Sequence, residues 1–116
     1  MALIKSCLAS AGAPIYAHVQ ETIAHASPLV FTITDGIGKD LLACNIVTNP
    51  AGTFGNCQKS FWNDNGTYEG SAIVGRTDVI TAMDIAYNKA TGELTVTLTD
   101  TSHNTSYPTT IDAMFI

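Results

Sequence analysis

Residues 79–100 have the sequence VITAMDIAYNKATGELTVTLTD, and their pattern decides the fold class. In the second half, apolar side chains alternate with threonines at Leu94, Val96 and Leu98, as in a β-strand with one buried and one polar face. In the first half, the side chains expected on one face are Val79, Thr81, Met83, Ile85 and Tyr87, with Asp84 on the other. Between the halves, Asn88 favours a turn, and Gly92 suits the left-handed position that closes a bulged hairpin loop. The stretch therefore predicts a β-hairpin.

The same alternation recurs along the chain between turn clusters such as 49–52 and 63–66. Further strands are expected around Ile15, Ala17 and Val19; Leu29, Phe31 and Ile33; Leu42, Cys44 and Ile46; Tyr68, Gly70, Ala72 and Val74; and Ile111, Ala113 and Phe115. Seven or eight short strands at near-regular spacing predict an all-β chain, either a single antiparallel β-sandwich or a barrel. Periodicity does not determine strand order, so both architectures stay open.

The N-terminal residues follow a different period. Leu3, Ile4, Cys7, Leu8 and Ala11 lie at helical spacing, and Gly12 and Pro14 would end a helix there. We expect a short helix or arm over residues 1–13 and one β domain over residues 14–116, because 116 residues suffice for a single domain with its own core.

Composition excludes several classes of protein. Hydrophobic residues make up 46% of the chain and charged residues 13%, which excludes intrinsic disorder. Five basic residues against ten acidic ones argue against nucleic-acid binding. No apolar run is long enough to span a membrane. Because Lys5 and Ser6 interrupt the N-terminal apolar stretch, we expect no signal peptide and synthesis in the cytoplasm.

The cysteine spacing and the search for catalytic motifs give no indication of a reactive site. Cys7, Cys44 and Cys57 are an odd number at wide spacings, which favours reduced thiols, with a Cys44–Cys57 disulfide as the alternative. The chain has no G-x-S-x-G motif, and the Gly-rich turn at 35–40 lacks the residues of a phosphate-binding loop. No zinc-like spacing or calcium-loop register is present. We therefore expect no enzyme activity, no cofactor and no metal.

The most distinctive local mixture is aromatic, around residues 54–68. Trp62, Asn65 and Tyr68 are candidate ligand-binding residues, since rings on loops near asparagine can stack on a sugar or anchor a partner. The alternative is that Phe54 and Phe61 fill the core while Trp62 covers one end of the sandwich.

The two ends of the chain are apolar. The last six residues, IDAMFI, are hydrophobic almost to the final position, so they must be held in a sheet or against a neighbouring molecule. The predicted intersubunit contacts are Leu3, Ile4, Leu8, Met114, Phe115 and Ile116.

Three stretches resemble one group of proteins: MALIKSCLASAG (1–12), TITDGIGKDLLACNIVTNP (32–50) and YNKATGELTVTLTD (87–100). They are similar to small β-rich virion proteins of bacteriophages and prophages, namely head-decoration, head-fibre, tail or baseplate components. The resemblance implies a symmetric homo-oligomer on a particle, with a trimer favoured and other virion proteins as partners. It transfers no functional residue. The alternative function is a carbohydrate- or receptor-binding module on a phage tail or cell surface.

Overall fold

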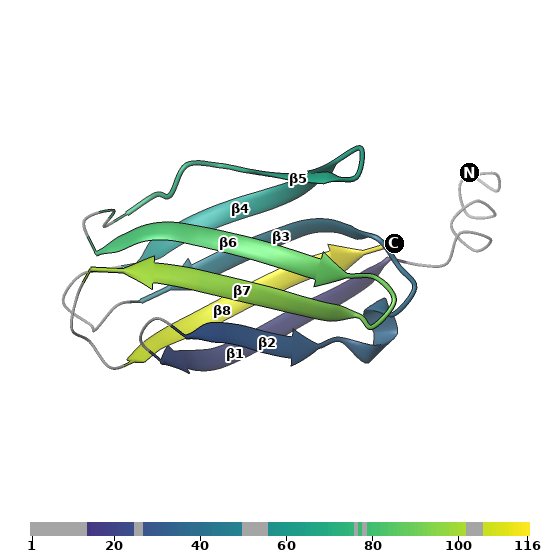
Figure 1. The fold of residues 1–116 in the computed structure, drawn as a ribbon, viewed down its shortest axis with the longest axis horizontal. Coiled ribbons are helices and arrows are strands. Elements are labelled where there is room, and N and C mark those ends of the chain that lie inside the picture. Colours follow the sequence, from purple (N-terminus) through teal and green to yellow (C-terminus); the bar gives the residue numbers. More distant parts are fainter. Residues whose placement is uncertain (1–13, 25–26, 50–55, 76, 78, 102–105) are drawn as a thin grey trace.

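The computed structural model describes residues 14–24, 27–49, 56–75, 77, 79–101 and 106–116. Eight antiparallel strands form two sheets packed face to face (Figure 1), so the fold is a β-sandwich and not a barrel. The strands are β1 (Ile15–Ala24), β2 (Pro28–Thr32), β3 (Leu41–Thr48), β4 (Cys57–Asp64), β5 (Thr67–Gly70), β6 (Ile80–Asn88), β7 (Glu93–Asp100) and β8 (Ser106–Phe115). The expected N-terminal helix or arm, 1–13, lies outside the described residues.

The two sheets differ in size. The larger has the order β1-β8-β3-β4-β5 and the smaller the order β2-β7-β6. Figure 1 shows the smaller sheet lying across the larger one. Consecutive strands pair directly in the β3-β4-β5 meander and in the β6–β7 hairpin, whereas the other connections pass from one sheet to the other. A short 3-10 turn, Thr34–Gly36, lies on the connection from β2 to β3. Among the described residues, no helix could cross a membrane.

The core lies between the inner faces of the two sheets. Its largest fully buried side chains include Tyr107, Phe115, Leu41, Ile46, Ile80, Met83, Leu94, Ile111 and Val96. The predicted alternation of β7 is confirmed, because Leu94, Val96 and Leu98 are all buried. Burial of these apolar surfaces is the main favourable term in folding.

Two buried threonines, Thr48 and Thr109, form a hydrogen bond with each other within this core. The hydroxyl of Thr109 donates to the carbonyl of Tyr107 over 2.9 Å, and its oxygen lies 2.9 Å from the hydroxyl of Thr48. The Thr48 hydroxyl also has a carbonyl acceptor, that of Pro108, at 3.4 Å. Both buried hydroxyls are therefore hydrogen-bonded, as burial of a polar group requires.

Local irregularities shift the phase of two predicted strands. The register shifts between Ile80 and Ala82, so Ile80 is fully buried and Thr81, expected on the inner face, is exposed. A similar shift between Leu41 and Ala43 buries Leu41 in place of Leu42. An extra residue on one strand reverses the side-chain alternation on one side of the bulge. The predicted faces were therefore wrong at these two positions.

The aromatic segment is a strand and not a loop. β4 carries Phe61 and Trp62 on opposite faces, with Phe61 buried and Trp62 exposed. Its middle, Gln58-Lys59-Ser60, is polar on both faces, which conceals the alternation in the sequence. The strand expected to continue to Val74 ends at Gly70, and Val74 forms only an isolated bridge with Gln58.

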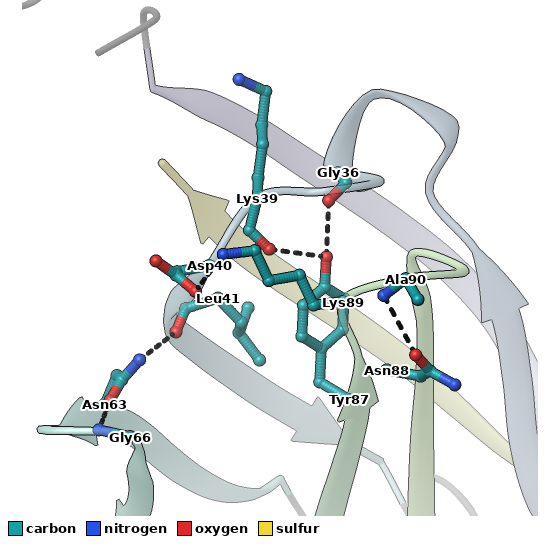
Figure 2. Close-up of polar contacts among 10 residues, drawn as sticks. All are labelled: Gly36, Lys39, Asp40, Leu41, Asn63, Gly66, Tyr87, Asn88, Lys89 and Ala90. Atoms are coloured by element: carbon teal, nitrogen blue, oxygen red, sulfur yellow. Dashed lines mark hydrogen bonds and ion pairs between the residues drawn. The ribbon is translucent and has the colours of Figure 1, made fainter.

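The turns follow the predicted chemistry. β4 and β5 are joined by Asn65-Gly66, with φ of 55° and 94°, the positive values that a type I′ hairpin turn requires. The carboxamide oxygen of Asn63 accepts the amide of Gly66 over 2.7 Å (Figure 2). Between β6 and β7, Gly92 has φ +71° and donates its amide to the carbonyl of Asn88 over 2.8 Å, confirming the predicted hairpin.

The C-terminal strand is fixed inside its own sheet. β8 pairs with β1 on one side and β3 on the other, and Ile116 exchanges two backbone hydrogen bonds with Asp40. The Tyr87 ring packs 5.3 Å from that of Phe115 between centroids. As Figure 2 shows, the Tyr87 hydroxyl is shared between the carbonyls of Gly36 and Lys39, at 2.7 and 3.2 Å. The apolar C-terminus is thereby accounted for by the sheet.

Gly92→Ala should destabilise the fold more than Gly38→Ala. Both glycines have a similar positive φ, +71° and +77°, which costs a non-glycine residue roughly 1–2 kcal/mol. A methyl group at Gly92 would also lie 2.7 Å from the carbonyl oxygen of Ile33 and from Ile37 Cγ1, whereas at Gly38 nothing lies within 4 Å. Urea unfolding of the two variants measures the difference. Equal losses of stability would show that the close contact at Gly92 contributes nothing.

Candidate functional site

The outer face of the five-stranded sheet carries the most distinctive set of exposed side chains. The strand register aligns them in two rows across β1, β8, β3 and β4. The apolar row is Tyr16, Met114, Ala43 and Trp62; the polar row is His18, Asp112, Asn45 and Ser60. Residues opposite each other in antiparallel strands point to the same face, so each row forms a continuous band.

The apolar row holds two exposed aromatic rings. Tyr16 is 74% and Trp62 46% exposed, and they lie on strands three spacings apart, so about 14 Å separates their positions. Met114 and Ala43 lie between them, and both are only partly buried. Exposed aromatic side chains next to small and flexible apolar ones are typical of contact surfaces.

The polar row is held by its own hydrogen bonds. His18 Nδ1 lies 2.5 Å from Asp112 Oδ1. The carboxamide oxygen of Asn45 accepts from the Ser60 hydroxyl over 2.9 Å and from Gln58 Nε2 over 3.1 Å. Both of those donors come from β4. The amide nitrogen of Asn45, on the other side of the carboxamide, is therefore turned toward β8.

A shallow pocket of about 300 Å³ lies where the two rows meet. Its lining includes Tyr16, His18, Asn45, Ser60, Asp112 and Met114. A second depression, of about 460 Å³, involves Gln20 of β1, Thr110 of β8 and Val47 of β3, and its lining includes no aromatic ring. The first pocket therefore combines a stacking surface with hydrogen-bonding groups, as ligand sites do.

This face does not assemble a nucleophile with a base. The His18–Asp112 pair resembles the orienting half of a catalytic triad, but Ser60 lies three strands from His18, about 14 Å away, and donates to Asn45. Burial and the negative charge of Asp112 raise the pKa of the Cys44 thiol to about 12. Cys44 is therefore protonated at neutral pH and a poor nucleophile. No group of three metal-ligating side chains occurs within the described ranges.

The structure separates the predicted ligand-binding residues. Trp62 is opposite Glu69 on the outer face, whereas Tyr68 is opposite Asn63 and packs against the core. Asn65 lies in the hairpin turn. Burial, followed in size by the negative charge of Asp40, raises the pKa of Tyr68. Only Trp62 of the three belongs to the outer face.

The predicted intersubunit residues also fall in different places. Leu3, Ile4 and Leu8 lie outside the described residues. Phe115 is completely enclosed by its own domain and offers no surface to a partner. Met114 is part of the apolar row, and Ile116 is half-buried beside Asp40.

Sequence reasoning missed most of this site. Tyr16 and His18 alternate with the apolar residues of the first predicted strand, so the sequence alone could have indicated that both are exposed. Nothing in the sequence indicates that β8 lies between β1 and β3, which alone brings Asp112 next to His18 and Asn45.

Cys44 and Cys57 are not joined, since Cys44 is a free buried thiol. The Cys44–Cys57 disulfide, kept as an alternative from the sequence, is therefore absent.

In comparisons with known proteins, the chain matches no family model and no curated protein.

Alkaline pH should weaken the fold through Cys44. Its pKa of about 12 in the folded chain exceeds the ordinary 9.0, so above pH 9 the unfolded chain loses the thiol proton first. The stability contributed by the neutral thiol is complete below pH 9 and is lost as the pH rises toward 12. We expect urea unfolding to show a smaller alkaline loss for Cys44→Ala than for the unchanged chain.

Burial also raises the pKa values of Tyr68 and Tyr87, so their ionisation destabilises the fold at alkaline pH in the same direction. Both tyrosines are present in the Cys44→Ala variant and in the unchanged chain, so their contribution is the same in the two proteins. An identical pH dependence of the variant and the unchanged chain would contradict the assignment to Cys44.

Proposed function

We propose that the protein is a structural component of a bacteriophage particle that acts through protein–protein contacts in a symmetric homo-oligomer. The resemblance of residues 1–12, 32–50 and 87–100 to small virion proteins supports this location on a particle. The same resemblance favours a trimer, with sister copies and other virion proteins as partners. The proposal involves no nucleic acid, no membrane and no catalysis.

The observation that carries the proposal is the open edge of β1. This ten-residue strand pairs with β8 along its whole length, and no described strand pairs with its other edge. Unpaired N–H and C=O groups on such an edge are a template for pairing with another chain. β1 contains no lysine, proline or register shift, the features that commonly block edge pairing. Glu21 is the one Asp, Glu, Lys or Arg on the strand.

The charge on Glu21 is compatible with pairing between copies. If two β1 strands pair antiparallel around Val19, Glu21 lies opposite Ala17 of the second copy, so the two carboxylates do not face each other. A closed trimer instead requires β1 to meet a different edge of the next copy, because a repeated self-complementary contact generates only pairs. In both arrangements the sheet continues across the interface.

Light scattering coupled to size-exclusion chromatography tests the assembly. At micromolar concentration we expect three times the chain mass of 12.2 kDa. In that assembly, amide hydrogen exchange along β1 should be slower than in a dissociated sample. A stable monomer with rapidly exchanging β1 amides would overturn the proposal.

The predicted N-terminal contacts need a separate experiment. Replacing Leu3 and Leu8 by serine should lower the oligomer mass if they contact a sister copy, because exposed serine forms no apolar interface. Val30→Ser is the matched control, since Val30 is a half-exposed apolar residue on the smaller sheet. An unchanged mass in the double variant would remove these residues from the interface.

The second candidate function is a carbohydrate- or receptor-binding module. The outer-face pocket favours it, because Tyr16 presents an exposed ring next to the hydrogen-bonded polar row. The two functions are compatible, since the open edge of β1 and the outer face of the sheet are different surfaces.

A further inference from the structure

Two of the polar side chains in the outer-face pocket, Asp112 and Asn45, each keep one atom that forms no hydrogen bond with the described residues. Asp112 Oδ1 lies 2.5 Å from His18 Nδ1, whereas its second oxygen forms no hydrogen bond with any described residue. The carboxamide oxygen of Asn45 already accepts two hydrogen bonds from β4, but its amide nitrogen donates none within the described part of the chain. Asn45 and Asp112 are directly opposite each other in the β3–β8 register. The free acceptor and the free donor therefore lie side by side.

Neighbouring hydrogen bonds fix the orientation of both groups. A carboxylate only accepts hydrogen bonds, so Nδ1 of His18 carries the proton that it donates to Asp112. Ser60 and Gln58 hold the carbonyl end of Asn45 toward β4, which keeps its amide directed toward β8. These three residues act as positioning residues. The donor–acceptor pair is thus preorganised, which lowers the entropic cost of binding.

A carboxylate oxygen beside an amide N–H group is complementary to two adjacent hydroxyls. One hydroxyl donates to Asp112 while its neighbour accepts from Asn45. The pocket lining contains no lysine or arginine, so a phosphate or carboxylate ligand would meet the charge of Asp112 without a lysine or arginine to offset it. The charge pattern therefore favours a neutral, hydroxyl-rich ligand.

The wall of the pocket supplies an apolar surface for such a ligand. Tyr16 lines the pocket and is 74% exposed, so its ring is open to stacking against the C–H face of a sugar. Met114 lies opposite Tyr16 in the register and continues the apolar surface. Trp62 lies beyond Ala43 on the same row, where a longer chain of sugars would extend from the pocket.

We propose that this pocket binds a neutral saccharide with adjacent hydroxyls, with the sugar ring on Tyr16 and the hydroxyls on Asp112 and Asn45. The inference rests on the second candidate function and specifies its ligand class and its residues. A second copy of the chain is the competing occupant. A polar row crosses the middle of this face, however, whereas the centre of an interface between copies is depleted in charged groups.

The proposal is tested by titrating the 116-residue chain with methyl glycosides of mannose, galactose and glucose and following its backbone amide chemical shifts. At millimolar sugar we expect saturable shifts of residues 16–18, 43–45 and 112–114 for at least one glycoside, and none with glucose 6-phosphate. Tyr16→Ala and Asp112→Asn should each weaken binding at least tenfold. Tyr16→Phe keeps the ring and should retain binding, as should Val30→Ala on the smaller sheet.

The dispersion of the amide spectrum shows whether each variant is folded. No saturable shift with any of the three glycosides would overturn the proposal. Shifts confined to another region, such as the Asn65–Gly66 turn, would overturn this site while leaving the second candidate function intact. Shifts of the same residues on dilution without sugar would show that a second copy covers the face, which also overturns the proposal. Light scattering on the same samples measures the oligomer mass independently. A failure of the proposed assembly can therefore be told apart from a failure of the proposed saccharide site.

Discussion

The pairing of β8 on both of its edges is the constraint on which the rest of the structure depends. β8 joins the first strand of the chain to β3, and its inner side chains, including Tyr107, Ile111 and Phe115, are buried in the core. Its other side chains, Asp112 and Met114 among them, lie on the outer face. One strand thus supplies both the packing that stabilises the sandwich and the centre of the candidate binding surface.

This double role explains how an apolar C-terminus can be compatible with a folded single chain. Phe115 is enclosed by its own domain. The Tyr87 hydroxyl holds the adjacent loop in place through its hydrogen bonds to the carbonyls of Gly36 and Lys39. The apolar side chain of Phe115 therefore does not require a partner. The open edge of β1 and the resemblance to virion proteins support the proposed assembly, while the outer face is a separate surface that carries polar groups.

The polar row illustrates how a flat sheet can hold a defined hydrogen-bonding site. Each side chain on a sheet has a neighbour on the adjacent strand at a fixed spacing, so a chain of hydrogen bonds can fix the orientation of every group. Here Ser60 and Gln58 orient Asn45 from one side, and His18 pairs with Asp112 from the other. The carboxylate and amide that remain available are consequently aligned without any loop contribution.

Local pattern determined most of the strands and the all-β fold class. The alternation of Leu94, Val96 and Leu98 and the glycine at position 92 were sufficient for the β6–β7 hairpin, because side-chain period and turn conformation are properties of neighbouring residues. The bulges near Thr81 and Leu42, and the polar strand β4, depended on cross-strand contacts and could not be predicted in this way. Only the tertiary structure decided the site, since His18, Asn45 and Asp112 are far apart in sequence and meet through strand order, which periodicity does not encode.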